Sequence, residues 1–450
     1  MKKLLFTLHC TGQLFKRNTD KWILIALFLT ALMGIPRLCP AQNQKAENSL
    51  KKIESIFIVG NKHTDDHVIR RELLFEEGDV ISDSILQVSK KRIENLMLFN
   101  RVDMKVTNNV SGHMLIISVT ERLYLFPYPA VGLEDRDWDK ITYGFGLAHD
   151  NFRGNNEKLY LLFLFGYRPG YEFAYSNPWV HRKLHLTFDI NLYNYTSPNR
   201  IFDFNEKHFF TAFTIGKYWT RNFFTKVRFL RDRIQVDDAF APFLQSGETS
   251  EQNYAVYMIN RYDGRDLYAY PSRGWYTMME LRKNGFFHND LDYWKAYLDL
   301  RHYLSIQSFI VAARLYSVQS MGDLPVYDGV YFGFDDRVRG HFNRVWSGNH
   351  SLLGSVELRF PILPVRYFTI PTKFIPQYLT KDLKFGINGG IFGESGQVWQ
   401  DHESFKSDKF IHGYGFGLHF RVPYIEVLRL DLAFDENGNS QYVFETGLAF

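Results

Sequence analysis

The sequence predicts a mainly β protein: a transmembrane antiparallel β-barrel of about 16 strands, preceded by one small α/β domain. From about Leu125 to Phe450, polar and apolar residues alternate with the period of two that strands show when one face meets lipid. Aromatic residues make up 17% of the 450-residue chain. Mean hydropathy is −0.26, which is too polar for a membrane protein built from helices.

The N-terminal residues 1–41 are expected to form a signal peptide. Five basic residues precede an apolar stretch at 22–35: Lys2, Lys3, Lys16, Arg17 and Lys21. That stretch is shorter than the roughly 20 residues that a spanning helix needs. Small residues around Ala41 predict cleavage there, and a retained membrane anchor is the alternative. Both cysteines, Cys10 and Cys39, lie in this segment, so the mature chain would have no thiol chemistry.

A short polar linker at residues 42–52 is expected to lead into an α/β unit at 53–122. The segment at 53–61 alternates like a strand and ends at a Gly-Asn turn. Two stretches of helical spacing follow, with Thr64 and Ser82 as candidate caps. Two further strands complete the order strand, helix, helix, strand, strand. A generic small α/β domain is one interpretation of this order of elements.

The same segment resembles a polypeptide-transport-associated (POTRA) domain. The resemblance rests on I-x-I-x-G-N-x-x-T, on RREL followed by GD, on S-x-x-R-I-x-N-L and on LFNRV. It implies a periplasmic domain with a strand edge to which an extended polypeptide can add by β-augmentation.

The strands of residues 125–450 are expected to form the barrel. In the segment 293–304, one face would carry Tyr293, Lys295, Tyr297, Asp299, Arg301 and Tyr303, and the other is mainly apolar. A soluble sandwich would also alternate. However, these strands are long, numerous and aromatic, and closure would satisfy every backbone group in lipid. At roughly 20 residues per strand and connection, the span suggests about 16 strands.

The chain ends on an alternating segment that is typical of outer-membrane barrels. On one face of this segment, at 441–450, we expect a C-terminal barrel signal made of Tyr442, Phe444, Leu448 and Phe450, with Thr446 between them.

The barrel segment resembles the BamA/TamA-like surface-antigen superfamily. The resemblance rests on six stretches: YSNPW at 175–179, YDGRDLYAYPSRGWYTMMEL at 262–281, VRGH at 338–341, GSVELRFPIL at 354–363, IFGESGQVW at 391–399 and GYGFGLHFRVP at 413–423. Together with the POTRA-like unit, the resemblance covers nearly the whole mature chain.

The resemblance implies that Val338, Arg339, Gly340 and His341 lie on a long extracellular loop that folds back into the lumen. Arg339 would pair there with carboxylates on barrel strands, Glu357 and Glu394, the latter in place of the family's Asp. Strand parity independently puts both acids on polar faces. Arginine suits such a role because its planar fork binds carboxylates bidentately. An exposed loop arginine is the alternative.

In the resembling assembly factors, the first and last barrel strands pair weakly and the seam between them templates a nascent client. The resemblance therefore implies insertion or translocation of client polypeptides at the bacterial outer membrane, with the POTRA domain in the periplasm. The implied partners are outer-membrane lipid, unfolded or nascent outer-membrane proteins at the POTRA edge strand and the seam, and periplasmic or lipoprotein accessory proteins. We expect a monomeric barrel and no nucleic-acid partner. A dedicated secretion transporter, a pore, and a structural surface antigen without assembly activity remain open.

We expect no enzymatic activity, no catalytic residues, no cofactor and no metal site. The sequence has no G-x-S-x-G, no G-x-x-x-x-G-K-[ST] and no H-E-x-x-H. Scattered histidines such as His63 and His67 are expected to be solvated loop residues rather than ligands.

Overall fold

The computed structural model describes residues 50–450, apart from 110–111, 134–137, 182, 200–201, 203, 288–290, 334–336, 342–343, 402 and 404. The expected signal peptide and residues 42–49 of the expected linker lie outside the described residues. No helix in the described part is long and apolar enough to cross a membrane. The predicted fold class is confirmed: a 16-stranded antiparallel sheet follows a four-stranded α/β unit.

The α/β unit is a small sheet covered by helices around an apolar core. Its elements are β1 (Lys51–Val59), α2 (Asp66–Arg70), β2 (Val80–Ile81), α3 (Asp83–Glu94), β3 (Phe99–Asn109) and β4 (Gly112–Glu121). The sheet order is β2-β1-β4-β3, with β1 parallel to β4. Ile53, Ile93 and Ile117 are completely buried in its core.

Three details of this unit differ from the sequence prediction. The predicted order lacks β2, a strand of only two residues. β1 starts at Lys51, inside the expected linker, because Lys51 and Lys52 pair with Ile81 and Val80. The N-cap position of α2 is Asp65 rather than Thr64, and the Asp65 side chain makes no capping hydrogen bond.

Thr64 instead helps to hold the segment that joins the unit to the barrel. Its main-chain nitrogen and its hydroxyl both donate to Glu121 Oε1, each over 2.8 Å. Thr64 Oγ1 also lies 2.9 Å from the hydroxyl oxygen of Tyr124. Burial raises the pKa of the Glu121 carboxyl, but hydrogen bonds from His63 and Thr64 outweigh burial and lower that pKa below its usual range.

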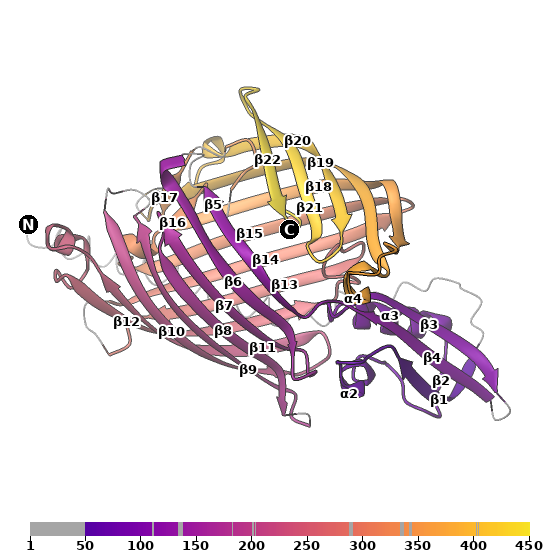
Figure 1. Cartoon of the computed structure of the whole chain (residues 1–450). Coiled ribbons are helices and arrows are strands. Elements are labelled where there is room, and N and C mark those ends of the chain that lie inside the picture. Colours follow the sequence, from indigo (N-terminus) through magenta and orange to yellow (C-terminus); the bar gives the residue numbers. More distant parts are fainter. Residues whose placement is uncertain are drawn as a thin grey trace, which may run out of the picture. The chain divides into compact units, whose positions relative to one another are not determined.

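The barrel sheet contains sixteen strands that neighbour one another in chain order. They are β5 (Leu125–Leu133), β6 (Ile141–Phe152), β7 (Glu157–Gly166), β8 (Gly170–His181), β9 (Leu186–Pro198), β10 (Asn205–Tyr218), β11 (Phe223–Gln235), β12 (Ser250–Asp263), β13 (Gly274–Asn284), β14 (Tyr293–Ile306), β15 (Phe309–Gly322), β18 (His350–Phe368), β19 (Leu383–Trp399), β20 (Ile411–Val422), β21 (Glu426–Asp435) and β22 (Ser440–Thr446). Figure 1 shows them curling into a barrel from β5 to β22.

Shorter elements lie in the connections between these strands. The two short strands β16 (Val330–Phe332) and β17 (Trp346–Gly348) pair with each other between β15 and β18. A one-turn helix, α4 (Gln377–Thr380), lies between β18 and β19.

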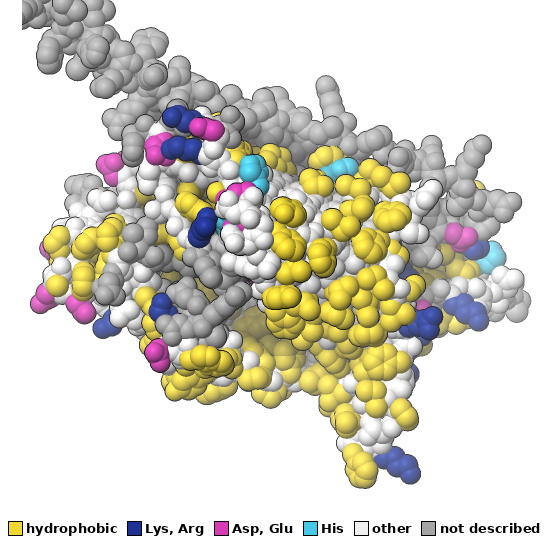
Figure 2. All heavy atoms as spheres, turned by 90° about the horizontal axis from the view of Figure 1, so that it is seen from above, with side chains coloured by type: hydrophobic (Ala, Val, Ile, Leu, Met, Phe, Trp, Pro, Cys, Tyr) yellow, Lys and Arg dark blue, Asp and Glu magenta, His cyan; other side chains and the backbone are white. Residues whose placement is uncertain are grey.

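The two faces of the barrel sheet differ in polarity as the alternation predicts. On β14, the inward-facing Lys295, Asp299 and Tyr303 are at most 3% exposed. Outward-facing apolar side chains are much more exposed: Phe213 on β10 is 49% and Phe229 on β11 is 51% exposed. Figure 2 shows hydrophobic side chains spread broadly over the face of the molecule in view. An apolar exterior around a polar interior suits a barrel in lipid.

The last residues do not share one face as the alternation of 441–450 predicts. Tyr442 and Phe444 are each 69% exposed on the outer face, and Leu448 is half-buried. β22 ends at Thr446, and Gly447 takes a φ of +80°, which ends the alternation. Phe450 is therefore only 4% exposed, and it packs against two residues of the inner wall, Tyr303 and Ala312.

Phe213→Arg tests the outer face of the barrel. Phe213 pairs with Ile190 and Phe229 across the neighbouring strands, so the new charge would enter an apolar surface. In phospholipid vesicles we expect the free energy of unfolding, measured by urea titration, to fall by about 2–4 kcal/mol. The control Phe213→Leu keeps the surface apolar and should lose about 1 kcal/mol or less. Equal losses in the two variants would contradict burial of this face in hydrocarbon.

Candidate functional site

The connection between β15 and β18 turns inward and packs on the barrel wall in its described residues, 323–333, 337–341 and 344–349, which we call the inner loop. Val338 of this loop is completely buried. It packs with Phe332 of the same loop and with Leu353 of β18. The loop therefore occupies part of the barrel interior.

Arg339 follows Val338 in the sequence and lies with it in the barrel interior. It is 3% exposed. Its Nε donates to Glu394 over 2.9 Å, its Nη1 to Asp431 over 2.8 Å and its Nη2 to Glu357 over 3.2 Å. The Arg339 main-chain nitrogen also donates to Glu394, over 2.8 Å. The planar guanidinium thus joins one loop to three strands, β18, β19 and β21, through charge-assisted hydrogen bonds.

Two further arginines complete a balanced group of charges. Arg359 Nε donates to Glu357 over 2.6 Å, and Arg429 Nε lies 3.0 Å from Asp431. We call this group the charge cluster; its members are Arg339, Arg359, Arg429, Glu357, Glu394 and Asp431, and each is at most 7% exposed. Removing one member would leave a buried charge without its partner, which typically destabilises by about 3–5 kcal/mol.

The structure brings Arg339 together with Glu357 and Glu394, the two partners that the resemblance implied, and adds Asp431. Sequence reasoning missed Asp431, although a signal was present. In RLDLAFD, alternation places Arg429, Asp431 and Asp435 on one polar face of the strand.

The remaining residues of the VRGH motif shape the loop around Arg339. Gly340 has a φ of +102°, and a Cβ there would lie 2.6 Å from the Phe434 oxygen, so only glycine fits without strain. The His341 side chain is 1% exposed, and its Nε2 is 2.9 Å from the His412 oxygen and 2.8 Å from Glu436. The motif therefore combines a buried apolar residue, a buried charge, a turn at Gly340 and the hydrogen-bonded side chain of His341.

Glycines on the inner face of β20 make room for this arrangement. A Cβ on Gly413 would lie 1.9 Å from the Arg339 oxygen, and one on Gly417 would lie 1.9 Å from Asp431 Oδ1. Phe392, on the neighbouring β19, places its ring centroid 3.4 Å from Arg339 Cζ, a cation–π contact. The surroundings of Gly413 and Gly417 are thus the inner loop and the charge cluster.

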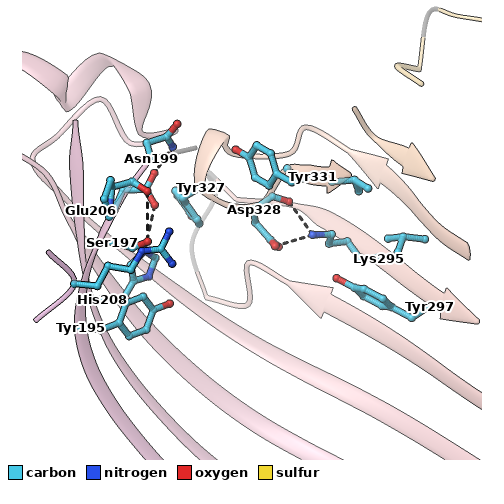
Figure 3. A pocket seen from close by; sticks show the side chains of 15 residues that line it. Tyr195, Ser197, Asn199, Glu206, His208, Lys295, Tyr297, Tyr327, Asp328 and Tyr331 are labelled. Atoms are coloured by element: carbon cyan, nitrogen blue, oxygen red, sulfur yellow. Dashed lines mark hydrogen bonds and ion pairs between the residues drawn. The ribbon is translucent and has the colours of Figure 1, made fainter. Parts of the chain in front are cut away.

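The inner loop has a second anchor nearer its start. Lys295 Nζ donates to Asp328 Oδ1 over 2.7 Å, and the Tyr293 hydroxyl donates to Asp328 Oδ2 over 2.8 Å. Figure 3 shows Lys295 pointing toward Asp328 at one side of a cavity of about 410 Å³. Tyr195 and His208 of the opposite wall line its other side. The loop is thus held at two points along its length.

In the described part of the chain, no group of three or more His, Cys, Asp or Glu residues is arranged to hold a metal ion.

Comparisons with known families match two segments of the chain. Residues 151–450 match the Omp85 superfamily domain. Residues 51–122 match the POTRA family described as a surface antigen variable number repeat.

Similar proteins include an outer membrane protein assembly factor BamA from Neorickettsia risticii (strain Illinois). It is 31% identical over 110 residues, which are 24% of this chain and 14% of that protein, so most of the relative has no counterpart in the match.

Two solved structures are also similar. BamA from Haemophilus ducreyi lacking POTRA domains 1–3 has a TM-score of 0.51 and 16% identity, covering 88% of this chain and 83% of that one. CdiB from Acinetobacter baumannii has a TM-score of 0.48 and 15% identity, covering 88% of this chain and 73% of that one. The likeness to the BamA structure concerns the fold.

Gly417→Ala tests the space that the charge cluster requires. The new Cβ would collide with Asp431, so we expect a loss of about 1–3 kcal/mol in the free energy of unfolding. The inner loop should also become more susceptible to trypsin at Arg337 and Arg344. The matched control is Gly393→Ala, because a Cβ on Gly393 meets nothing within 4 Å. Similar stability and cleavage in the two variants would show that the cluster does not depend on this glycine.

Proposed function

The chain belongs to the Omp85 superfamily, and on this premise we propose that it is a bacterial outer-membrane protein that assists the insertion of β-rich client polypeptides. In this proposal the POTRA domain lies in the periplasm, and the inner loop belongs to the opposite, extracellular end of the barrel. In this proposal the action is non-covalent: the protein provides strand edges rather than a catalytic group.

The observation that carries the proposal is the seam, by which we mean the facing edges of β5 and β22. These strands form the two ends of the barrel sheet, and no backbone pairing joins their described residues. Unpaired backbone groups are costly in lipid, and a free strand edge is a template for another strand. A client strand that entered here would satisfy groups that the barrel alone leaves open.

The POTRA domain supports the same function with a second edge. β3 is an end strand of its four-stranded sheet. An extended client segment could add to such an edge through main-chain hydrogen bonds, with little demand on its sequence. The domain could then hold a client close to the membrane before insertion. Accessory periplasmic proteins or lipoproteins would use the same kind of contact.

A pore or dedicated secretion transporter is the second candidate, and the inner loop bears on it. The loop is anchored inside the barrel through the charge cluster and through Asp328. Conduction or secretion through the lumen would require this loop to move. Lateral insertion at the seam requires no such movement, so the geometry favours an insertion factor. A purely structural surface antigen would have no use for an unpaired seam.

The proposal can be tested with purified protein in phospholipid vesicles. We expect a urea-unfolded small barrel protein to fold faster in these vesicles than in protein-free ones. Arg339→Ala should lose much of this acceleration, because it frees the loop and leaves three carboxylates without their common partner. Arg344→Ala, an exposed residue of the same loop, is the control and should remain active. No acceleration by the wild type, together with large ion conductance, would favour the pore.

A further inference from the structure

The hairpin of β18 and β19 extends beyond its neighbours at one end of the barrel. In the described part of the chain, β18 pairs with β15 only as far as Arg359, but it pairs with β19 as far as Phe368. β18 is 19 residues long, whereas a strand needs about 9–11 residues to cross a membrane. β18 is the twelfth of the sixteen strands in chain order, so it ends at the end of the barrel where β5 begins. The chain enters the barrel from the POTRA domain at that end.

Residues 361–378, which we call the projecting segment, carry many exposed apolar side chains. Phe374 is 96% exposed. Exposed apolar patches of this kind mark sites of interaction with a membrane or with another protein. Eight large apolar side chains of the segment are each at least 38% exposed: Ile362, Val365, Tyr367, Phe368, Ile370, Phe374, Ile375 and Tyr378.

Hydrogen bonds tie the projecting segment to the barrel. The Ile370 main-chain nitrogen donates to the Thr380 oxygen over 2.9 Å. The Tyr424 hydroxyl, from the turn between β20 and β21, donates to the Tyr378 oxygen over 2.9 Å. The apolar side chains are therefore presented by a folded segment with defined contacts.

The charged residues of the projecting segment are all basic. They are Arg366 and Lys373, both exposed, and the segment contains no Asp or Glu. Lys373 directly precedes the exposed Phe374. Exposed apolar side chains next to cations are typical of segments that lie at the boundary between lipid headgroups and acyl chains. Anionic headgroups attract such cations.

Two prolines make the free edge of the segment a poor site for another strand. Pro361 and Pro364 lie beyond the last β18 residue that pairs with β15. Proline has no N–H group to donate to a partner strand, and proline on a free edge opposes pairing there. A partner protein that adds a strand needs those donors. A lipid surface does not, so the prolines favour lipid as the partner.

The apolar surface of the barrel continues into the projecting segment. Along β18, Val356 lies within the barrel and Ile362 lies just beyond the last pair with β15, and each is 54% exposed. In the proposed location, the barrel part of this surface contacts hydrocarbon. The part that extends beyond the barrel then meets the headgroup region of the same leaflet.

We propose that the projecting segment binds the headgroup region of the leaflet on the POTRA side of the membrane. Phe374 and its apolar neighbours lie among the outer parts of the acyl chains, and Arg366 and Lys373 contact the phosphates of anionic phospholipids. This inference rests on the proposed location of the barrel in the outer membrane, and it does not depend on client insertion.

A first experiment maps contacts with lipid. The purified protein is placed in vesicles of phosphatidylcholine and phosphatidylglycerol, with a trace of phosphatidylcholine that carries a photoreactive group in its acyl chain. Mass spectrometry then locates the crosslinks. We expect crosslinks at 370–378 as well as on the outer face of the barrel. Phe374→Ser should reduce those at 370–378 by about tenfold, since burial of a phenylalanine side chain favours the bound state by about that factor or more.

The control for this variant is Phe287→Ser. Phe287 is 89% exposed in the connection between β13 and β14, at the other end of the barrel, and its loss should leave the crosslinks at 370–378 unchanged. Crosslinks on the barrel without any at 370–378 would overturn the proposal and assign the exposed patch to a protein partner. If the barrel strands gave no crosslinks either, the proposed location of the barrel would fail, and the inference with it.

A second experiment tests the charge of the lipid. In vesicles with phosphatidylglycerol, we expect Lys373→Gln to reduce crosslinks at 370–378 by about fivefold, because one cation near an anionic surface contributes about that factor. In vesicles of phosphatidylcholine alone, the same variant should match the wild type. Lys183→Gln, which removes an exposed cation from the turn between β8 and β9 at the same end, is the control and should have no effect. An equal reduction by Lys373→Gln in both kinds of vesicle would overturn the assignment to anionic lipid.

Discussion

A buried guanidinium is stable only when its charge is matched inside the protein, and the interior of this barrel is organised around that requirement. Arg339 enters the interior on a loop, and its three acidic partners come from three different strands. Arg359 and Arg429 balance the remaining negative charge. Desolvating such a set is expensive, so its value lies less in added stability than in specifying one position of the loop.

Arginines of the charge cluster and of the inner loop also contact β22 and the residues that follow it. Arg429 and Arg337 both contact Glu445 of β22. Arg359 Nη2 donates to the Phe450 oxygen over 3.2 Å. The position of the inner loop and the position of the seam edge of β22 are thus coupled through shared arginines. In the proposed function, a fixed loop would keep the β22 edge of the seam in one position.

Much of the fold follows from patterns that a single sequence carries. The period of two along 125–450 predicts the barrel strands and their polar faces, and it places Glu357 and Glu394 toward the interior. The connection of Arg339 to these acids came from a family resemblance, because loop closure depends on contacts that no local pattern encodes. Alternation in 429–435 also places Asp431 toward the interior, but it does not say which loop residue meets that carboxylate. The alternation of the last ten residues does not predict that the chain turns at Gly447 and brings Phe450 inward.

The coupling between Arg339 and Asp431 is the most direct measure of whether the charge cluster holds the loop. A double-mutant cycle with Arg339→Ala and Asp431→Asn, followed by urea titration in vesicles, would give it. We expect the two changes to be non-additive by about 2 kcal/mol, since each residue is buried against the other. Changes in stability that add to within about 0.5 kcal/mol would contradict the central claim, because residues that do not interact behave in that way.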